Sequence, residues 1–294
     1  MPESQRRRLI VNGDDFGLTA GVNRAVREAH SMGILTSTTV LITGVAAEEA
    51  GALPADCPDL SVGLHVNFSF SPASDPATIR SLVDDEGQFL SDKEMLRGIV
   101  TRKVSPRDVH REVSSQIDRL RALGVTPTHW DAHRAVAFWP GLCAPAARAA
   151  HDGGIRRVRT PRIWTVEPGR SPAMARWRWR FDRPIRFGTE ANRLLARRTL
   201  ERRFTLPDWR LSPNLVESGD DYVTRWRTAL ATVPPGTSEM VSHPAYVDDE
   251  LRILTPNLTG DRETDLLVMT DPEVAADLAA AGIELCGYGE LRPR

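Results

Sequence analysis

The chain has 294 residues, of which 41% are hydrophobic and 26% charged, and its 38 lysines and arginines nearly balance its 39 aspartates and glutamates. This composition is typical of a globular protein, and a formal net charge of −1 excludes the large basic excess of a general nucleic-acid binder. The three cysteines are widely spaced and form no Cys-x-x-Cys pair, which argues against a zinc-cysteine site and indicates reduced thiols in a cytoplasmic protein.

No stretch of the sequence approaches the ~20 apolar residues that a membrane span requires. The first apolar run, residues 9–11, ends at Asn12 and is too short for a signal peptide. We therefore expect no transmembrane segment.

Short apolar segments alternate with longer amphipathic ones, which is typical of a parallel sheet covered by helices. In the first half of the chain we expect a strand at 9–12, a turn at 13–17, a helix at 20–32, strands at 36–42 and 60–66, a long loop at 67–89, a helix at 105–123, a strand at 128–132, a helix at 140–152 and a strand at 155–158. In the second half we expect a helix at 221–231, a strand at 238–242, helices at 263–268 and 272–281, and a strand at 283–286.

Residues 165–213 interrupt this alternation, because they are rich in arginine and tryptophan and contain no clear strand. We interpret them as an insertion, helical at about 190–203, in a single domain that spans residues 1–294. Tryptophans such as Trp177 and Trp179 could stack on sugar rings or lie at lipid headgroups, with arginines binding anionic groups. The interpretation we favour is that they pack against the domain or form a subunit contact.

The βα alternation occurs without a G-x-G-x-x-G or G-x-x-x-x-G-K-[ST] phosphate loop, which argues against dinucleotide-binding and P-loop folds. The α/β fold that we expect is an irregular (β/α) barrel, similar to a TIM barrel. In such barrels the chemistry takes place at the carboxyl ends of the strands. The polar residues that follow the strands are therefore the candidate functional residues.

Three of the expected strands end in residues of metal-ligand type. Asp14 and Asp15 follow the first strand and His65 lies in the third. Asp131 and His133 end the strand at 128–132. Each residue alone could be a helix cap or a buried polar group, but a carboxylate with two imidazoles is a common catalytic set for Zn²⁺ and related ions. Their occurrence together predicts a divalent metal site.

Two adjacent aspartates suggest a division of labour, in which one binds the metal and the other takes a proton from water. A further polar strand end is His243, which is a candidate general acid or substrate ligand. The alternative for this histidine is a structural position beneath the mouth of the barrel.

Several of these segments together resemble the YdjC-like carbohydrate deacetylases, a group that includes chitooligosaccharide deacetylases and proteins associated with hopanoid biosynthesis. The resemblance is collinear over nearly the whole chain. It is carried by residues 12–19 (Asn-Gly-Asp-Asp-Phe-Gly-Leu-Thr), 21–23, 37–39, 62–67, 128–133 and 239–244.

The resemblance implies one divalent metal ion held by Asp15, His65 and His133, with Asp14 as the general base and His243 as a further catalytic residue. Zn²⁺ or Mg²⁺ is expected, and Mn²⁺, Co²⁺ and Ni²⁺ are alternatives. The residues expected to bind the substrate are Arg159, Asn67, Asp131 and Glu239.

The sequence departs from the family after His133. The family pattern is Asp-x-His-Gln-His, whereas residues 131–137 here read Asp-Ala-His-Arg-Ala-Val-Ala. The additional histidines are lost, which concerns contacts to the substrate more than metal binding.

We therefore expect a metal-dependent hydrolase that removes an N-acetyl group from an amino sugar or from a glycan or glycolipid that contains one. We expect it in the cytoplasm, as a homodimer, with peripheral lipid contact left open. One alternative is a hydrolase of another bond, such as a phosphoester or another amide, although phosphoester cleavage often uses two metals ~3.5–4 Å apart. A second alternative is a non-catalytic sugar-binding barrel. Such a protein is expected to lack the base or a metal ligand, yet Asp14, Asp15, His65 and His133 are all present.

Overall fold

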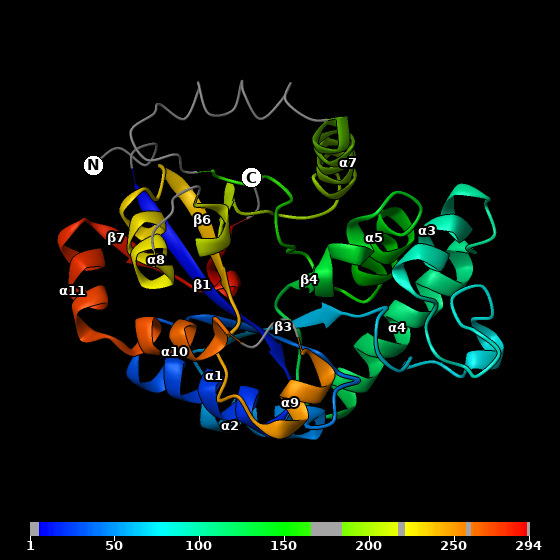
Figure 1. Cartoon of the computed structure of the whole chain (residues 1–294), viewed down its shortest axis with the longest axis horizontal. Helices are drawn as coiled ribbons and strands as arrows, with labels where there is room; N and C mark the ends of the chain where they lie inside the picture. Colours follow the sequence, from blue (N-terminus) through cyan, green and yellow to red (C-terminus); the bar gives the residue numbers. More distant parts are fainter. Residues whose placement is uncertain (1–5, 166–183, 217–220, 257–259, 293–294) are drawn as a thin grey trace.

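The structure of the chain, a computed structural model, describes residues 6–165, 184–216, 221–256 and 260–292. A parallel seven-stranded sheet lies in the middle of the molecule, in the order β4-β3-β2-β1-β6-β5, with β7 paired to β1 (Figure 1). The strands are β1 (Arg7–Phe16), β2 (Ser37–Val40), β3 (Ser61–Val66), β4 (Trp130–Ala132), β5 (Trp209–Leu211), β6 (Gly236–Ser242) and β7 (Ile283–Leu285). The expected α/β class with parallel strands is confirmed.

Helices cover the sheet on its outer side (Figure 1). They are α1 (Ala20–Met32), α2 (Leu53–Asp56), α3 (Asp92–Val100), α4 (Pro106–Ala122), α5 (Cys143–Asp152), α7 (Pro184–Leu200), α8 (Tyr222–Ala231), α9 (Asp249–Leu254), α10 (Arg262–Thr270) and α11 (Pro272–Ala280). Helix α1 begins where expected, because the Thr19 hydroxyl accepts a hydrogen bond from the Val22 amide. Three of these helices were not expected. They are the short α2, α3, which starts at a capping box between Ser91 and Glu94, and α9, which is capped by Asp248.

Strand β1 is central and positions the site. Side chains alternate between the two faces of a strand, and accordingly Leu9 and Val11 join the main core whereas Ile10 packs in a small separate cluster with Tyr288. The strand pairs with β6 over Arg7–Gly13 and with β2 from Asn12 onward. The strand is buried from Leu9 to Phe16 because neighbouring strands pair with it on both sides.

The turn expected at residues 13–17 is wrong, because β1 continues to Phe16. The register of β1 against β2 shifts between Gly13 and Phe16, and Asp15 has the left-handed backbone angle φ of 70°. Because regular alternation would place consecutive side chains on opposite faces, this irregularity allows Asp14 and Asp15 to line the same cavity. The bulge therefore makes two neighbouring carboxylates available to one site.

The strand expected at 155–158 is also wrong in its extent. This segment makes only isolated bridges, from Val158 to Trp130 and from Arg157 to Thr205, and Ile163 makes another to Arg210. The strand β5, which lies inside the expected insertion, was not foreseen because it has only three residues. These bridges link the two edge strands of the sheet, β4 and β5, through residues 157–163.

The expected insertion contains α7 and β5 where it is described, and α7 overlaps the helical segment expected at about 190–203 but ends at Leu200. Trp177 and Trp179 lie outside the described residues. None of the helices in the described part of the chain combines the length and the apolar character needed to cross a bilayer.

Candidate metal centre

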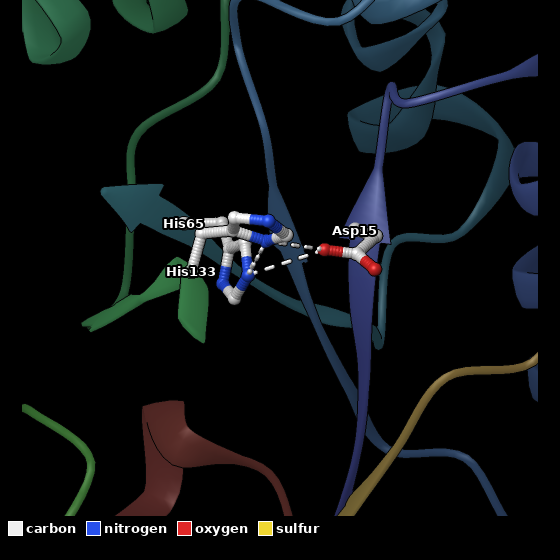
Figure 2. A group of neighbouring side chains, drawn as sticks. All are labelled: Asp15, His65 and His133. Carbon is white, nitrogen blue, oxygen red and sulfur yellow. Dashed lines mark hydrogen bonds and ion pairs between the residues drawn. The ribbon is translucent and has the colours of Figure 1, made fainter. Parts of the chain in front are cut away.

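Three strands bring the predicted ligand set together. Asp15 lies near the end of β1, His65 in β3, and His133 directly after β4, at the start of a 3₁₀ turn (Figure 2). After His133 the chain turns sharply through two left-handed residues, Arg134 with φ of 51° and Ala135 with φ of 58°. The carboxyl ends of neighbouring parallel strands meet at one edge, which is why residues from three distant segments converge here.

The ligand atoms of these three residues lie close enough to share one ion. The Asp15 Oδ1 atom is 3.3 Å from His65 Nε2 and 3.1 Å from His133 Nδ1. The two imidazole nitrogens are 3.3 Å apart, and all three side chains are buried. The phenyl ring of Phe70 packs against the imidazole of His133, with the ring centroids 5.4 Å apart.

The charges around His65 favour a cation at this place. Burial alone would lower the pKa of His65, but the neighbouring Asp131, Asp15 and Asp14 outweigh it and raise this pKa to about 10. A histidine must be neutral to bind a metal, so a divalent ion would take the place of that proton. One carboxylate and two imidazoles, all buried and within reach of one another, therefore fit a divalent metal ion.

Arg262 and Arg159 each hold one of the two adjacent aspartates. The Nη2 atom of Arg262 lies 2.7 Å from Asp15 Oδ2, which leaves Oδ1 facing the histidines. Burial would raise the pKa of Asp15, but the charge of Arg262 and hydrogen bonds from His133 and His65 hold it well below its usual range. Arg262 was not foreseen, because it lies on the buried face of α10 rather than at a strand end.

Asp14 has hydrogen-bond partners that differ from those of Asp15. Arg159 donates to both oxygens of this carboxylate, with Nη1 2.8 Å from Oδ2 and Nη2 2.6 Å from Oδ1. The side-chain amide of Asn12 donates to Oδ1 at 2.7 Å. Burial would raise the pKa of Asp14, but the charge of Arg159 and its hydrogen bonds keep it well below its usual range. The carboxylate is therefore held in its ionised form.

His243 lies at the opening of the site. Its side chain is 40% exposed, and its Nε2 atom is 3.8 Å from Asp14 Oδ2. The backbone amide of His243 donates to Asp265 Oδ2 at 2.7 Å, and the other oxygen of Asp265 accepts from Tyr222 and Trp226. Asp265, which was not foreseen either, thus fixes the turn that carries His243. Asp265 lies on the buried face of α10, beside Leu266 and Met269, and the sequence of this short helix carried little signal for it.

A cavity of about 320 Å³ gives access to these groups. Asp14, His65 and His243 line it together with the other two ligands. Arg134 lies on its wall, where its Nη2 atom is 2.6 Å from Asp92 Oδ2 of α3. The ligand set, the candidate base and the candidate acid therefore line one common cavity.

The four residues expected to bind the substrate are all buried. Arg159 is 3% exposed, and Asp131 and Glu239, which both pair with it, are fully buried beneath the cavity. Glu239 also accepts a hydrogen bond from Tyr288 at 2.7 Å. Asn67 accepts from the amides of the loop that follows it, which carries Phe70. These positions favour roles in holding the site together rather than direct contact with a substrate.

The chain is similar to a known protein family over most of its length. The model of the YdjC-like protein family matches residues 8–280. The chain is 32% identical to a carbohydrate deacetylase of Geobacillus stearothermophilus, over 97% of this chain and 98% of that protein. It is 30% identical to a carbohydrate deacetylase of Thermoanaerobacter pseudethanolicus, over 97% and 99% of the two chains.

A solved structure has the same fold. It is that of a candidate cellobiose-phosphate cleavage protein from Enterococcus faecalis V583, with a TM-score of 0.73 and 24% sequence identity. The alignment covers 98% of this chain and 100% of that chain.

Proposed function

The chain belongs to the YdjC-like protein family, and from this premise we propose that it is a divalent-metal-dependent carbohydrate deacetylase. It removes an N-acetyl group from an amino sugar, or from a glycan or glycolipid that contains one. The observation that carries the proposal is the placement of the ionised Asp14 and the imidazole of His243 beside the set of Asp15, His65 and His133 in one cavity.

We assign the metal to Asp15, His65 and His133. When bound there, a divalent ion polarises the amide carbonyl and activates water. Two imidazoles favour Zn²⁺, and Mg²⁺, Mn²⁺, Co²⁺ and Ni²⁺ are alternatives. A second group of ligand type, formed by Asp14, His65 and Asp131, shares its histidine with the first, and Arg159 already neutralises its carboxylates. This arrangement supports one ion and argues against a two-metal phosphoesterase.

Asp14 is the general base in this proposal. Its Oδ2 atom takes a proton from the attacking water, while two hydrogen bonds from Arg159 fix the orientation of the carboxylate. His243 is the general acid, and its Nε2 atom gives a proton to the amine nitrogen as the amide C–N bond breaks. Because Asp14 Oδ2 and His243 Nε2 are 3.8 Å apart, both can reach one reacting amide group.

The test is the release of acetate by the purified, metal-reconstituted protein from a panel of N-acetylated monosaccharides, chitooligosaccharides and glycolipids. We expect release from at least one of them, and its loss on treatment with a chelator and recovery on addition of Zn²⁺. Release of phosphate or cleavage of another amide by the loaded protein, with none of acetate, would contradict the proposal.

Further expectations about the fold, the cellular location and the partners belong to the proposal. The sheet and the bridging segment 156–163 together form an irregular (β/α) barrel, and residues 1–294 form one domain, with an insertion at about 165–213. The three free, buried cysteines favour a reducing compartment, and we place the enzyme in the cytoplasm. A homodimer stays a prediction. For the arginine- and tryptophan-rich segment, packing against the domain or a subunit contact stays the interpretation that we favour over a lipid contact.

A further inference from the structure

We propose that Asp131 is a positioning residue that couples the two halves of the site, the metal ligand His65 and the arginine that orients the base. This inference rests on the proposed function, because it assigns a metal to His65 and a proton transfer to Asp14. It gives Asp131 a role different from the substrate contact expected from the sequence.

Each oxygen of Asp131 serves one half of the site. Oδ1 lies 2.6 Å from His65 Nδ1. Oδ2 lies 2.8 Å from Arg159 Nη2 and accepts the hydroxyl of Thr39 at 3.1 Å. The side chain is fully buried, so water cannot substitute for either partner. The same Nη2 atom of Arg159 donates to Asp14 Oδ1 at 2.6 Å, which completes a path from the ligand to the base.

The contact to His65 determines which of its nitrogens can bind a metal. An ionised carboxylate only accepts hydrogen bonds, so His65 must carry its proton on Nδ1. The lone pair is then on Nε2, the atom that faces Asp15 Oδ1 at 3.3 Å. Partners that fix the tautomer of a metal-binding histidine typically change metal affinity ~10–100-fold when they are removed.

An asparagine at position 131 cannot satisfy both halves, although it has the same shape. If its amide NH₂ faces His65, the imidazole must accept on Nδ1 and protonate Nε2, which removes the lone pair needed by the metal. If the NH₂ faces Arg159 instead, two donors oppose each other and Arg159 loses one of the three carboxylates that hold it. Both orientations also remove the negative charge beside His65, which lowers the basicity of its Nε2 atom. Asp131→Asn is therefore expected to affect metal affinity and turnover together.

Glu239→Gln is the matched control. Glu239 also binds Arg159, with Oε1 2.9 Å from Nε, and it is equally buried. It makes no contact with His65 in the described residues. Glu239→Gln is therefore expected to lower turnover while it leaves metal affinity close to that of the unmodified protein.

The experiment measures Co²⁺ binding to the metal-free proteins by competition with a chromophoric chelator, together with the visible absorption of the Co²⁺ complex. We expect the dissociation constant of Asp131→Asn to rise ~10–100-fold, with a changed Co²⁺ spectrum, and that of Glu239→Gln to stay within about twofold. This measurement needs no substrate, so it decides the role of Asp131 even if no acetate release is found.

Equal Co²⁺ affinity in Asp131→Asn and the unmodified protein would overturn the proposal, and so would an equal loss in Glu239→Gln. Circular dichroism verifies that each variant folds. If Asp131→Asn does not fold, Thr39→Val is measured instead, because the Thr39 hydroxyl lies 3.1 Å from Asp131 and 3.2 Å from His65 Nδ1. A rise in its Co²⁺ dissociation constant is expected, and an unchanged constant would contradict the coupling.

Discussion

Arg159 holds Asp14 through both of its terminal nitrogens, at 2.8 Å and 2.6 Å from the two carboxylate oxygens. This pair lies beside the ligand set and is not part of it. Each of the two adjacent aspartates has an arginine partner of its own. Arg159 fixes Asp14, and Arg262 fixes Asp15. The roles of the two aspartates can therefore be separated by experiment.

Asp14→Asn is expected to bind metal nearly as well as the unmodified protein and to lose turnover by ~10²–10⁴-fold, the usual contribution of a general base. Asp15→Asn, its neighbour, is expected to lose metal, because it removes the charged ligand. Metal content by elemental analysis and acetate release at saturating substrate measure the two effects. Substantial activity in metal-loaded Asp14→Asn would show that another group accepts the proton.

His243→Ala is expected to lower kcat by ~10²-fold or more, with a smaller change in KM, because its imidazole serves the departing amine rather than the ligand set. Substrates with a better leaving amine should be less affected, since they need less protonation. The measurement compares kcat for an N-acetylated sugar and an activated N-acetyl arylamine. An equal loss with both substrates would argue against an acid role for His243.

Asp265→Ala is expected to destabilise the fold by about 2–4 kcal/mol, because it leaves the buried Trp226 indole, the Tyr222 hydroxyl and the His243 amide without their common acceptor. Asp265→Asn keeps one acceptor oxygen and should cost less. Urea unfolding monitored by tryptophan fluorescence gives both values. A change below about 1 kcal/mol for Asp265→Ala would mean that water replaces the carboxylate.

The three cysteines are expected to react slowly in the folded protein. Burial raises the pKa of Cys143 and of Cys286 to about 12, and it also raises that of Cys57. Because the thiolate is the reactive form, few thiols are available at pH 8. A chromogenic disulfide reagent should titrate three thiols quickly in guanidinium and fewer than one in the native state over the same time. Rapid native labelling would reveal local opening.

The sequence indicated that Asp15, His65 and His133 lie near the carboxyl ends of strands, and the structure brings these side chains together. Their choice as metal ligands came from the family resemblance and stays a prediction. The sequence was not sufficient for Arg262 and Asp265, which enter the site from a helix. Which face of α10 meets the sheet depends on tertiary packing, and two polar residues on a short helix carry little periodic signal.

Strand positions were predicted better than the environment of their side chains. Glu239 lies opposite Ile10 in the register of β6 and β1, so it points into the closed interior below the cavity. Alternation along a strand gives the face of a residue but not its depth, so the burial of Glu239 and Asp131 could not be predicted from it. The bulge at Asp15 was not foreseen for a similar reason, since it depends on the pairing with β2.

The ligand set joins parts of the chain that are far apart in sequence: 118 residues separate Asp15 from His133, and 68 separate His65 from His133. An ion bound to all three acts as a cross-link between β1, β3 and the segment after β4. Binding to the folded chain alone adds RT ln(1 + [M]/Kd) to its stability, about 2.7 kcal/mol at a free metal concentration of 100 Kd. The melting temperature should therefore rise with metal concentration, and cells depleted of the ion would contain a less durable protein as well as an inactive one.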